Sequence, residues 1–371
     1  MLKWRRLIPL LVVLLLAAVF VAGCGQKKDE AKTPAPAGED KMKVGFVYIG
    51  TPGDAGFTYA HEQGRKYLVE QLPYVETEVV ENVTDADAER VITQLAEKGC
   101  RVIFTTSFGF MDPTLNVAKK YPDITFLHCS GYKTNDNMGT YFGRMYQARY
   151  LTGLVAGKMT KTNLIGYVAA FPIPEVVRQI NAFTLGVRQV NPEAKVKVIW
   201  TNSWTDPVAP KDVANTLLDA GADVIAQHQD TPSPQQAAEA RGKYSVGFNS
   251  DMAPLAPKAV LTSAVWNWGP YYVKTVEEIK AGTWKSGQYW GAMSDGIVDI
   301  TPFGPMVPAD VKQMVEAEKK KILSGEWDVF TGPIKDQTGK ERVAAGQRMS
   351  DKELLEFSWF VEGVEGTIPQ S

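Results

Sequence analysis

The sequence predicts an α/β protein with two doubly wound lobes, each built on a mainly parallel sheet with helices on both faces. Short apolar strands alternate with helices along most of the chain, a pattern typical of parallel sheets with helical crossovers. The alternation runs twice. About 330 residues follow the N-terminal segment, which is more than a single core usually organises and suits two domains.

The first run of alternating elements begins with a near-continuous apolar strand followed by a Gly/Pro turn at 50–54. Gly99 is well suited to end a helix, because glycine adopts the left-handed conformation found there. Strands are predicted at 43–49, 76–81, 102–105 and 124–128, and helices at 61–71, 85–98 and 114–120.

A helix at 149–159 leads into the second run. Strands are predicted at 164–168, 195–200, 224–227, 244–248, 260–265 and 296–300, and helices at 175–190, 212–220, 235–241, 270–281 and 309–323. From this pattern we expect lobe 1 to comprise 42–158 plus 269–295, and lobe 2 to comprise 159–268 plus 296–371. Crossovers between two such lobes would form a hinge that lets the cleft close.

Residues 1–23 predict an export signal: a basic start, an apolar run from Leu7 to Val21 and small residues before Cys24. The run is shorter than the ~20 apolar residues that comfortably span a bilayer. The sequence Val21-Ala22-Gly23-Cys24 is similar to the lipobox of bacterial lipoproteins, which implies that Cys24 is acylated. An ordinary secretory signal with an incidental cysteine is the alternative.

Residues 24–41 contain no aromatic or β-branched apolar side chain, so they predict a flexible tether with a reach on the order of 20–25 Å. The ordered part is therefore expected outside the cytoplasm, on the periplasmic or cell-surface side of the cell membrane. Contact with the membrane is expected through the lipid anchor only.

The composition excludes several classes of function. With 40 basic and 42 acidic residues the chain is nearly neutral, which argues against a nucleic-acid partner. The three histidines lie at 61, 128 and 228 without metal-ligand spacing, so neither a metal nor another cofactor is expected. Cys100 and Cys129 can pair only if their strands are neighbours, and two separate buried thiols are favoured.

The loops that follow the predicted strands are rich in aromatic, carboxylate and amide side chains. Ligands of open α/β sheets bind beyond the carboxyl ends of the strands, so these loops are expected to face the cleft. Aromatic faces stack on planar rings, and carboxylate or amide oxygens accept N–H groups, which favours a planar heterocycle. The candidate ligand-binding residues are Asp54, Phe57, Phe108, Phe110, Asp112, Phe171, Trp204, Asp230, Asn249, Asp251 and Trp266.

Some of these candidates have structural alternatives. Phe110 is equally compatible with packing in a core, and Asp112 before Pro113 with capping a helix. No nucleophile elbow, phosphate-binding loop, dinucleotide turn or metal cluster occurs in the sequence, so we expect a binding protein rather than an enzyme. A nucleoside-cleaving enzyme and a surface adhesion protein remain as alternatives.

Several short motifs occur in a specific order and spacing: Asp54-Ala-Gly-Phe57, Ser107-Phe-Gly-Phe-Met-Asp112, Gly247-Phe-Asn-Ser-Asp251 and Leu261-Thr-Ser-Ala-Val265. With them, the chain from Lys43 to about Gly304 resembles the basic membrane protein (BMP) family, solute-binding lipoproteins that include purine-nucleoside receptors of ABC importers. The resemblance implies Rossmann-like lobes in a type I periplasmic-binding fold, with importer permease subunits as partners. We expect a monomer.

The resemblance also implies that Asp54 and Asp112 bind the purine edge and that Phe57 stacks on the ring. Two positions depart from the nucleoside binders: Asn249 stands where they tend to carry Asp, and Trp266 where they place Lys. Those family positions help to hold ribose hydroxyls. We therefore expect a free nucleobase, with adenine as the first candidate, and a purine nucleoside as the alternative.

Overall fold

A computed structural model describes residues 41–204, 206 and 208–369. The predicted signal peptide, Cys24 and nearly all of the predicted tether lie outside these residues. Among the helices that are described, none is both long enough and apolar enough to cross a membrane.

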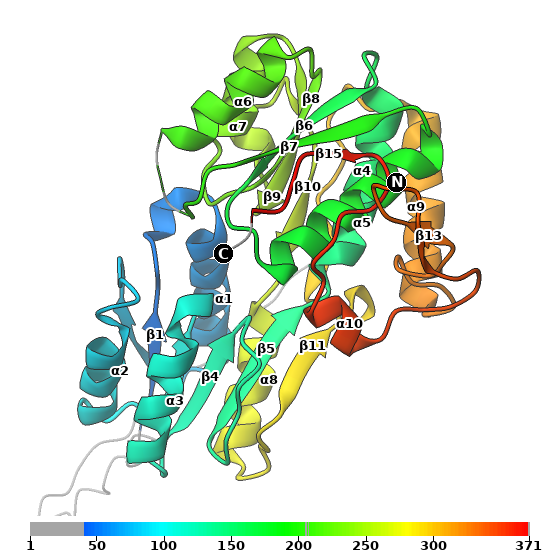
Figure 1. Cartoon of the computed structure of the whole chain (residues 1–371). Coiled ribbons are helices and arrows are strands. Elements are labelled where there is room, and N and C mark those ends of the chain that lie inside the picture. The colour runs from blue at the N-terminus through cyan, green and yellow to red at the C-terminus, as the bar shows by residue number, and fades with distance from the viewer. Residues whose placement is uncertain (1–40, 205, 207, 370–371) are drawn as a thin grey trace, which may run out of the picture. The chain divides into compact units, whose positions relative to one another are not determined.

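The first sheet has six strands, and every pairing in it is parallel (Figure 1). Its spatial order is β11 (Gln288–Gly291), β5 (Met138–Gly143), β4 (Thr125–Cys129), β3 (Val102–Thr105), β1 (Met42–Val47) and β2 (Val75–Val80). The chain therefore returns from residue 288 to complete a sheet whose other strands all come from its first 143 residues.

Helices cover both faces of the first sheet. Val47 and Ile103 point to the face covered by α2 (Ala88–Glu97) and α3 (Met111–Lys120). Their neighbours in the strands point the other way, toward α1 (Phe57–Gln71) and α8 (Gly269–Lys280), because successive side chains of a strand alternate between faces. A strand buried on both faces is apolar at nearly every position, which explains the near-continuous apolar runs.

The second sheet has seven strands, parallel except for the antiparallel pairing of β10 with β12. Its spatial order is β12 (Val298–Ile300), β10 (Val260–Trp266), β9 (Tyr244–Asn249), β8 (Val224–His228), β6 (Leu164–Ala169), β7 (Lys195–Trp200) and β15 (Val364–Glu365). One face packs on α6 (Ala209–Asp219) and α7 (Ser233–Ala240), and the other on α4 (Met145–Met159), α5 (Pro174–Val190) and α9 (Ala309–Ser324).

Helix α4 packs against α5 and strands β9, β10 and β12, although the predicted boundary at residue 158 placed it with lobe 1. The close approach of the two helices depends on Gly153 and Gly186. A Cβ atom at Gly153 would meet the carbonyl oxygen of Phe183, and one at Gly186 would meet that of Tyr150. Only glycine permits this contact, so α4 belongs to the packing of the second sheet.

The remaining elements were not all foreseen. The prediction missed β5 and β11, and it missed a C-terminal segment that wraps back onto the second sheet. This segment contains the hairpin β13 (Ile334–Lys335) and β14 (Glu341–Val343), the short helix α10 (Asp351–Leu355) and β15. Two parallel sheets with helices on both faces nevertheless confirm the predicted α/β class. Cys100 and Cys129 are separate buried thiols, as favoured.

Candidate functional site

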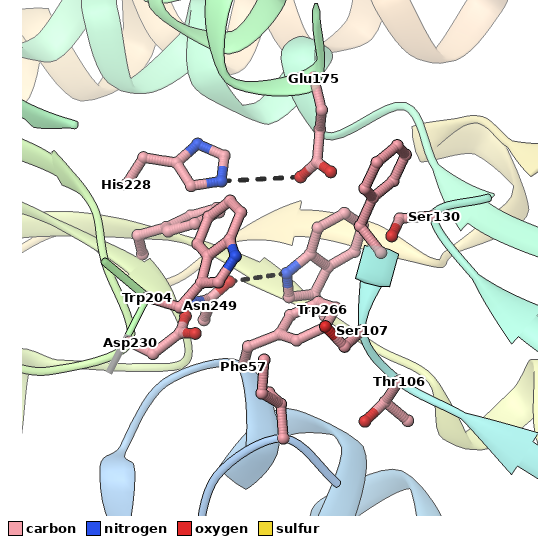
Figure 2. A pocket seen from close by; sticks show the side chains of 13 residues that line it. Phe57, Thr106, Ser107, Ser130, Glu175, Trp204, His228, Asp230, Asn249 and Trp266 are labelled. Atoms are coloured by element: carbon pink, nitrogen blue, oxygen red, sulfur yellow. Dashed lines mark hydrogen bonds and ion pairs between the residues drawn. The ribbon is translucent and has the colours of Figure 1, made fainter. Parts of the chain in front are cut away.

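A cavity lies where the carboxyl ends of both sheets meet (Figure 2). It measures about 420 Å³, including space that opens to solvent. Strands β1, β3, β4, β6, β7, β8, β9 and β10 all end beside it or lead into a loop that lines it. The lining residues are Ile49, Phe57, Thr106, Ser107, Phe108, Ser130, Glu175, Trp204, His228, Asp230, Phe248, Asn249 and Trp266.

A larger groove adjoins the cavity. The groove shares Phe108, Ser130 and Glu175 with the cavity, and it extends to α10 in the C-terminal segment. Its volume is about 1690 Å³, again counting open solvent.

Six of the candidate residues from the sequence line the cavity together: Phe57, Phe108, Trp204, Asp230, Asn249 and Trp266. They come from five different strand ends and from the start of α1. Their meeting follows from the topology, because the carboxyl ends of parallel strands lie at one edge of a sheet.

A chain of hydrogen bonds joins three of these residues. The indole Nε1–H of Trp266 donates to Asn249 Oδ1 at 2.9 Å, and Asn249 Nδ2 donates to Asp230 Oδ1 at 2.9 Å. The two positions that depart from the nucleoside binders are therefore direct partners of each other. Burial first, and the nearby Asp54 second, raise the pKa of Asp230 well above its ordinary value.

The Trp266 ring is held in place by other aromatic rings. It stacks on Trp268 with ring centroids 4.6 Å apart and planes inclined by 16°, and Trp268 stacks in turn on His61 at 4.7 Å. Phe57 meets Trp266 edge to face at 6.2 Å and His61 edge to face at 4.4 Å. Offset and edge-to-face arrangements are the ones aromatic pairs prefer, so Trp266 presents a rigid face.

A second aromatic group lies on the side of the second lobe. Trp204 packs between Phe171, at 5.2 Å, and His228, at 5.9 Å, and His228 lies 4.5 Å from the ring of Phe248. The guanidinium of Arg149 lies 3.6 Å from the centroid of the same Phe248 ring. Phe171 therefore supports Trp204 and does not line the cavity itself.

The other predicted candidates do not line the cavity and have structural roles. Asp54 accepts backbone N–H groups of Gly56, Thr58 and Tyr59 at 2.7–3.1 Å, so it caps the first turn of α1. Burial raises the pKa of Asp54, and these N–H groups oppose the rise.

The remaining three candidates are also placed elsewhere. Phe110 is fully buried in the core beneath α3. The side chain of Asp112 is 62% exposed and pairs with Lys133 at 2.6 Å. Asp251 is exposed and accepts the N–H of Ala253 at 3.0 Å. Core packing, ion pairing and local hydrogen bonding thus account for residues that the sequence could not distinguish from ligand contacts.

Seven lining residues were not among the candidates from the sequence, and Glu175 and His228 are the two of them with ionisable side chains. Glu175 lies in the first turn of α5, where it was read as part of a helix start. His228 is the last residue of β8, one position beyond the predicted end of that strand. A systematic inspection of the last residue of each strand and the first turn of each following helix would have found both.

The two lobes touch at one edge of the cavity. Ser250 Oγ donates to the carbonyl oxygen of Ala55. Gly56 lies so close to the second lobe that an added Cβ would be 2.6 Å from Asp230 Cα. A side chain at position 56 would hold the lobes apart, which explains glycine there.

The arrangement is chemically suited to binding a flat solute. Aromatic faces surround the space, and carboxylate, amide and hydroxyl groups stand at its edges. Ligand pockets of this kind are largely apolar with a few placed polar groups that fix orientation. Within the described residues, no group of three or more His, Cys, Asp and Glu side chains is placed to hold a metal ion.

Comparisons with known proteins fit this geometry. The family profile described as "ABC transporter substrate-binding protein PnrA-like" matches residues 41–329. The chain is 50% identical over 334 residues to a purine-binding protein of Brucella abortus, covering 90% of this chain and 95% of that protein. It is 44% identical over 335 residues to a putative ABC transporter glucose-binding protein of Haloferax volcanii, covering 90% and 83%.

Among solved structures, an ABC transporter solute-binding protein from Aeropyrum pernix K1 is similar with a TM-score of 0.68. The sequence identity is 20%, and the match covers 81% of this chain and 94% of that one. At this identity the likeness shows a common fold.

Proposed function

The chain belongs to the PnrA-like family of ABC transporter substrate-binding proteins, and we propose that it captures a free purine base, with adenine as the first candidate, between its two lobes. The family predicted from the sequence and the type I periplasmic-binding fold are both confirmed. Members of the family act outside the cytoplasm as the binding components of importers, so permease subunits are the partners of this chain.

The contact between Trp266 and Asn249 is the observation that favours a free base over a nucleoside as the ligand. Nucleoside binders of this family carry Lys and Asp at these positions to hold ribose. Here the indole of Trp266 lines the cavity instead, and its N–H already donates to Asn249 Oδ1. Asn249 Nδ2 is in turn directed at Asp230. The pair thus offers an apolar ring face where a sugar would need polar partners.

The aromatic lining supports a purine. Phe57, Trp204, Phe248 and Trp266 all line the cavity, and each presents a ring that can contact a flat heterocycle. Stacking on such rings contributes about 1–3 kcal/mol per base. The name of the Brucella abortus relative points to the same class of ligand.

The wild-type protein is expected to bind adenine in isothermal titration calorimetry, to bind adenosine at least about tenfold more weakly, and to show no heat with glucose. Saturation should also stabilise the fold by about 2.7 kcal/mol at 100 times the Kd, because the ligand binds only the native state. Mass spectrometry of the co-purified solute gives an independent check. Binding of glucose in place of any purine would refute the proposal.

Binding without catalysis is part of the same proposal. Asp230, the carboxylate of the cavity that could act as an acid, is occupied by Asn249, and Glu175 faces a neutral histidine. Incubation of the protein with adenosine should therefore release no adenine. Detection of released base by chromatography, absent with heat-denatured protein, would identify an enzyme instead.

We also propose that the mature chain is a monomer anchored through lipid on Cys24. The Cys24→Ala variant is expected to lose acylation, because only the thiol accepts the lipid, and to partition away from the membrane fraction. The measurement is an immunoblot of membrane and soluble fractions, with Cys100→Ala as the control because Cys100 is buried. Retention of the Cys24→Ala variant in membranes would contradict the anchor.

A further inference from the structure

Two carboxylates line the cavity, and they differ in whether their oxygen atoms are free to accept a hydrogen bond from a ligand. Asp230 already accepts a hydrogen bond from Asn249 at 2.9 Å, and it lies near the carboxylate of Asp54. Burial and that second negative charge both oppose its ionised form. Asp230 is therefore committed to contacts within the protein and is a poor site for negative charge.

Glu175 is in the opposite situation. Its Oε1 has polar contacts with Gln179 Nε2 at 3.4 Å and His228 Nε2 at 3.6 Å. The first distance is long for a hydrogen bond and the second is beyond the usual range. No hydrogen bond to Glu175 Oε2 is present within the part of the chain that the structure describes. The side chain is 17% exposed, and it faces the cavity (Figure 2).

The carboxylate of Glu175 lies in a positive electrostatic environment. It lies in the first turn of α5, where the helix dipole stabilises negative charge. The buried guanidiniums of Arg149 and Arg178 lie close enough for Glu175 to raise the pKa of each, although burial outweighs this effect. Glu175 therefore lies near two buried cations, neither of which forms an ion pair with it among the described residues.

His228 stands beside Glu175 and is 4% exposed. Burial lowers its pKa, and Arg149 and Arg178 lower it further against the opposing effect of Glu175, so the ring is neutral at pH 7. A neutral imidazole has one donor and one acceptor nitrogen. Its Nδ1 has no hydrogen-bond partner among the described residues. The pair therefore combines a carboxylate whose Oε2 can accept a hydrogen bond with a neutral imidazole ring.

We propose that Glu175, with His228 beside it, accepts an N–H group of the bound base and so selects bases that present a donor at this edge. The inference rests on the proposed function and names the residue that recognises the ligand. In the view of Figure 2, Glu175 and His228 lie across the cavity from Phe57, with Trp204 and Trp266 between these two sides. A flat ring held by those aromatic residues would point an edge at the carboxylate.

The test combines Glu175→Gln with ligand analogues in titration calorimetry. Glutamine keeps the volume and removes the charge, so adenine should bind about 10- to 100-fold more weakly, as expected for loss of a charged hydrogen bond. Glu193→Gln is the control, because Glu193 is exposed just beyond the end of the same helix. Its affinity should equal that of the wild type.

The analogues show whether the contact is direct. In 9-methyladenine the ring N9–H of adenine is replaced, and in 6-dimethylaminopurine the exocyclic N–H groups are replaced. The analogue that lacks the N–H accepted by Glu175 should bind the wild type about 10- to 100-fold more weakly than adenine does. In Glu175→Gln this difference should shrink to less than about threefold, because interacting groups are not additive. Full affinity of Glu175→Gln for adenine, or an equal loss for adenine and both analogues, would overturn the inference.

If Glu175→Gln does not fold, the binding of adenine and its analogues by the wild type tests the inference. Equal binding of adenine and both analogues by the wild type would then refute a role for Glu175. If the wild type binds no purine at all, the proposed function fails together with this inference. If only the role of Glu175 is wrong, the wild type binds adenine and Glu175→Gln binds it equally well, so the two outcomes can be told apart.

Discussion

Phe57→Ala is expected to weaken adenine binding by about 5- to 150-fold. The Phe57 ring lines the cavity, and its edge-to-face contacts with His61 and Trp266 fix its orientation. Loss of a stacking aromatic ring removes about 1–3 kcal/mol, and every 1.4 kcal/mol corresponds to a factor of ten in affinity. The measurement is titration calorimetry at constant pH and salt, with circular dichroism to establish that the variant is folded.

Asp112→Ala provides the matched control for Phe57→Ala. The sequence alone predicted that both residues contact the purine, whereas the structure places the Asp112 carboxylate outside the cavity in an exposed pair with Lys133. Exposed ion pairs contribute little, so the affinity of Asp112→Ala should remain within about twofold of the wild type. A large loss in Asp112→Ala, or unchanged binding in Phe57→Ala, would show that the cavity is not the purine site.

The double substitution Asn249→Asp with Trp266→Lys is expected to shift the preference from base to nucleoside. Removal of the indole opens the space beside Asn249, and the new Asp and Lys can pair with each other and with ribose hydroxyls. Two charged hydrogen bonds to a sugar justify a change of about 10- to 100-fold in the ratio of adenosine to adenine affinity. Competition titration with both ligands measures this ratio directly.

Trp266 is only 7% exposed and stacks on Trp268, so the double variant should also be less stable. Replacement of a buried Trp by alanine typically costs about 3–5 kcal/mol, and the longer Lys side chain should reduce that loss. Trp268→Phe serves as the control, because Trp268 is buried behind Trp266 and does not line the cavity. A folded double variant with an unchanged ratio would argue against the assignment of these positions to ribose.

The regular elements could be predicted because each carries its own pattern. Strands β3 and β7 have the predicted bounds. Strand β3 is a short apolar run that is buried throughout, and β7 alternates Lys and Val before Ile199, so each carries a pattern typical of a strand. Strand β5 was missed because Gly139 and Gly143 interrupt its apolar pattern. Strand β11 exists through its parallel pairing with β5, as in Gln288 opposite Thr140, and no local pattern can reveal a partner so distant in the sequence.

In the candidate site, too, local features could be predicted and contacts between distant residues could not. The sequence identified the loops that meet at the cavity, because parallel strands place their carboxyl ends together. It could not rank the residues within a loop. Phe108 and Phe110 are two positions apart, yet Phe108 lines the cavity and Phe110 is fully buried in a core. The intervening turn of 3-10 helix directs their side chains to different environments.

The sequence by itself determined the α/β class, the family and the set of loops that carry function, because apolar periodicity and short motifs are local properties of the chain. Only the tertiary structure decided that Asp54 caps a helix, that Trp266 donates to Asn249, and that Glu175 is the cavity carboxylate with an available oxygen. A hydrogen-bonding group is free or occupied according to its neighbours in space, and these neighbours come from strands far apart in the sequence.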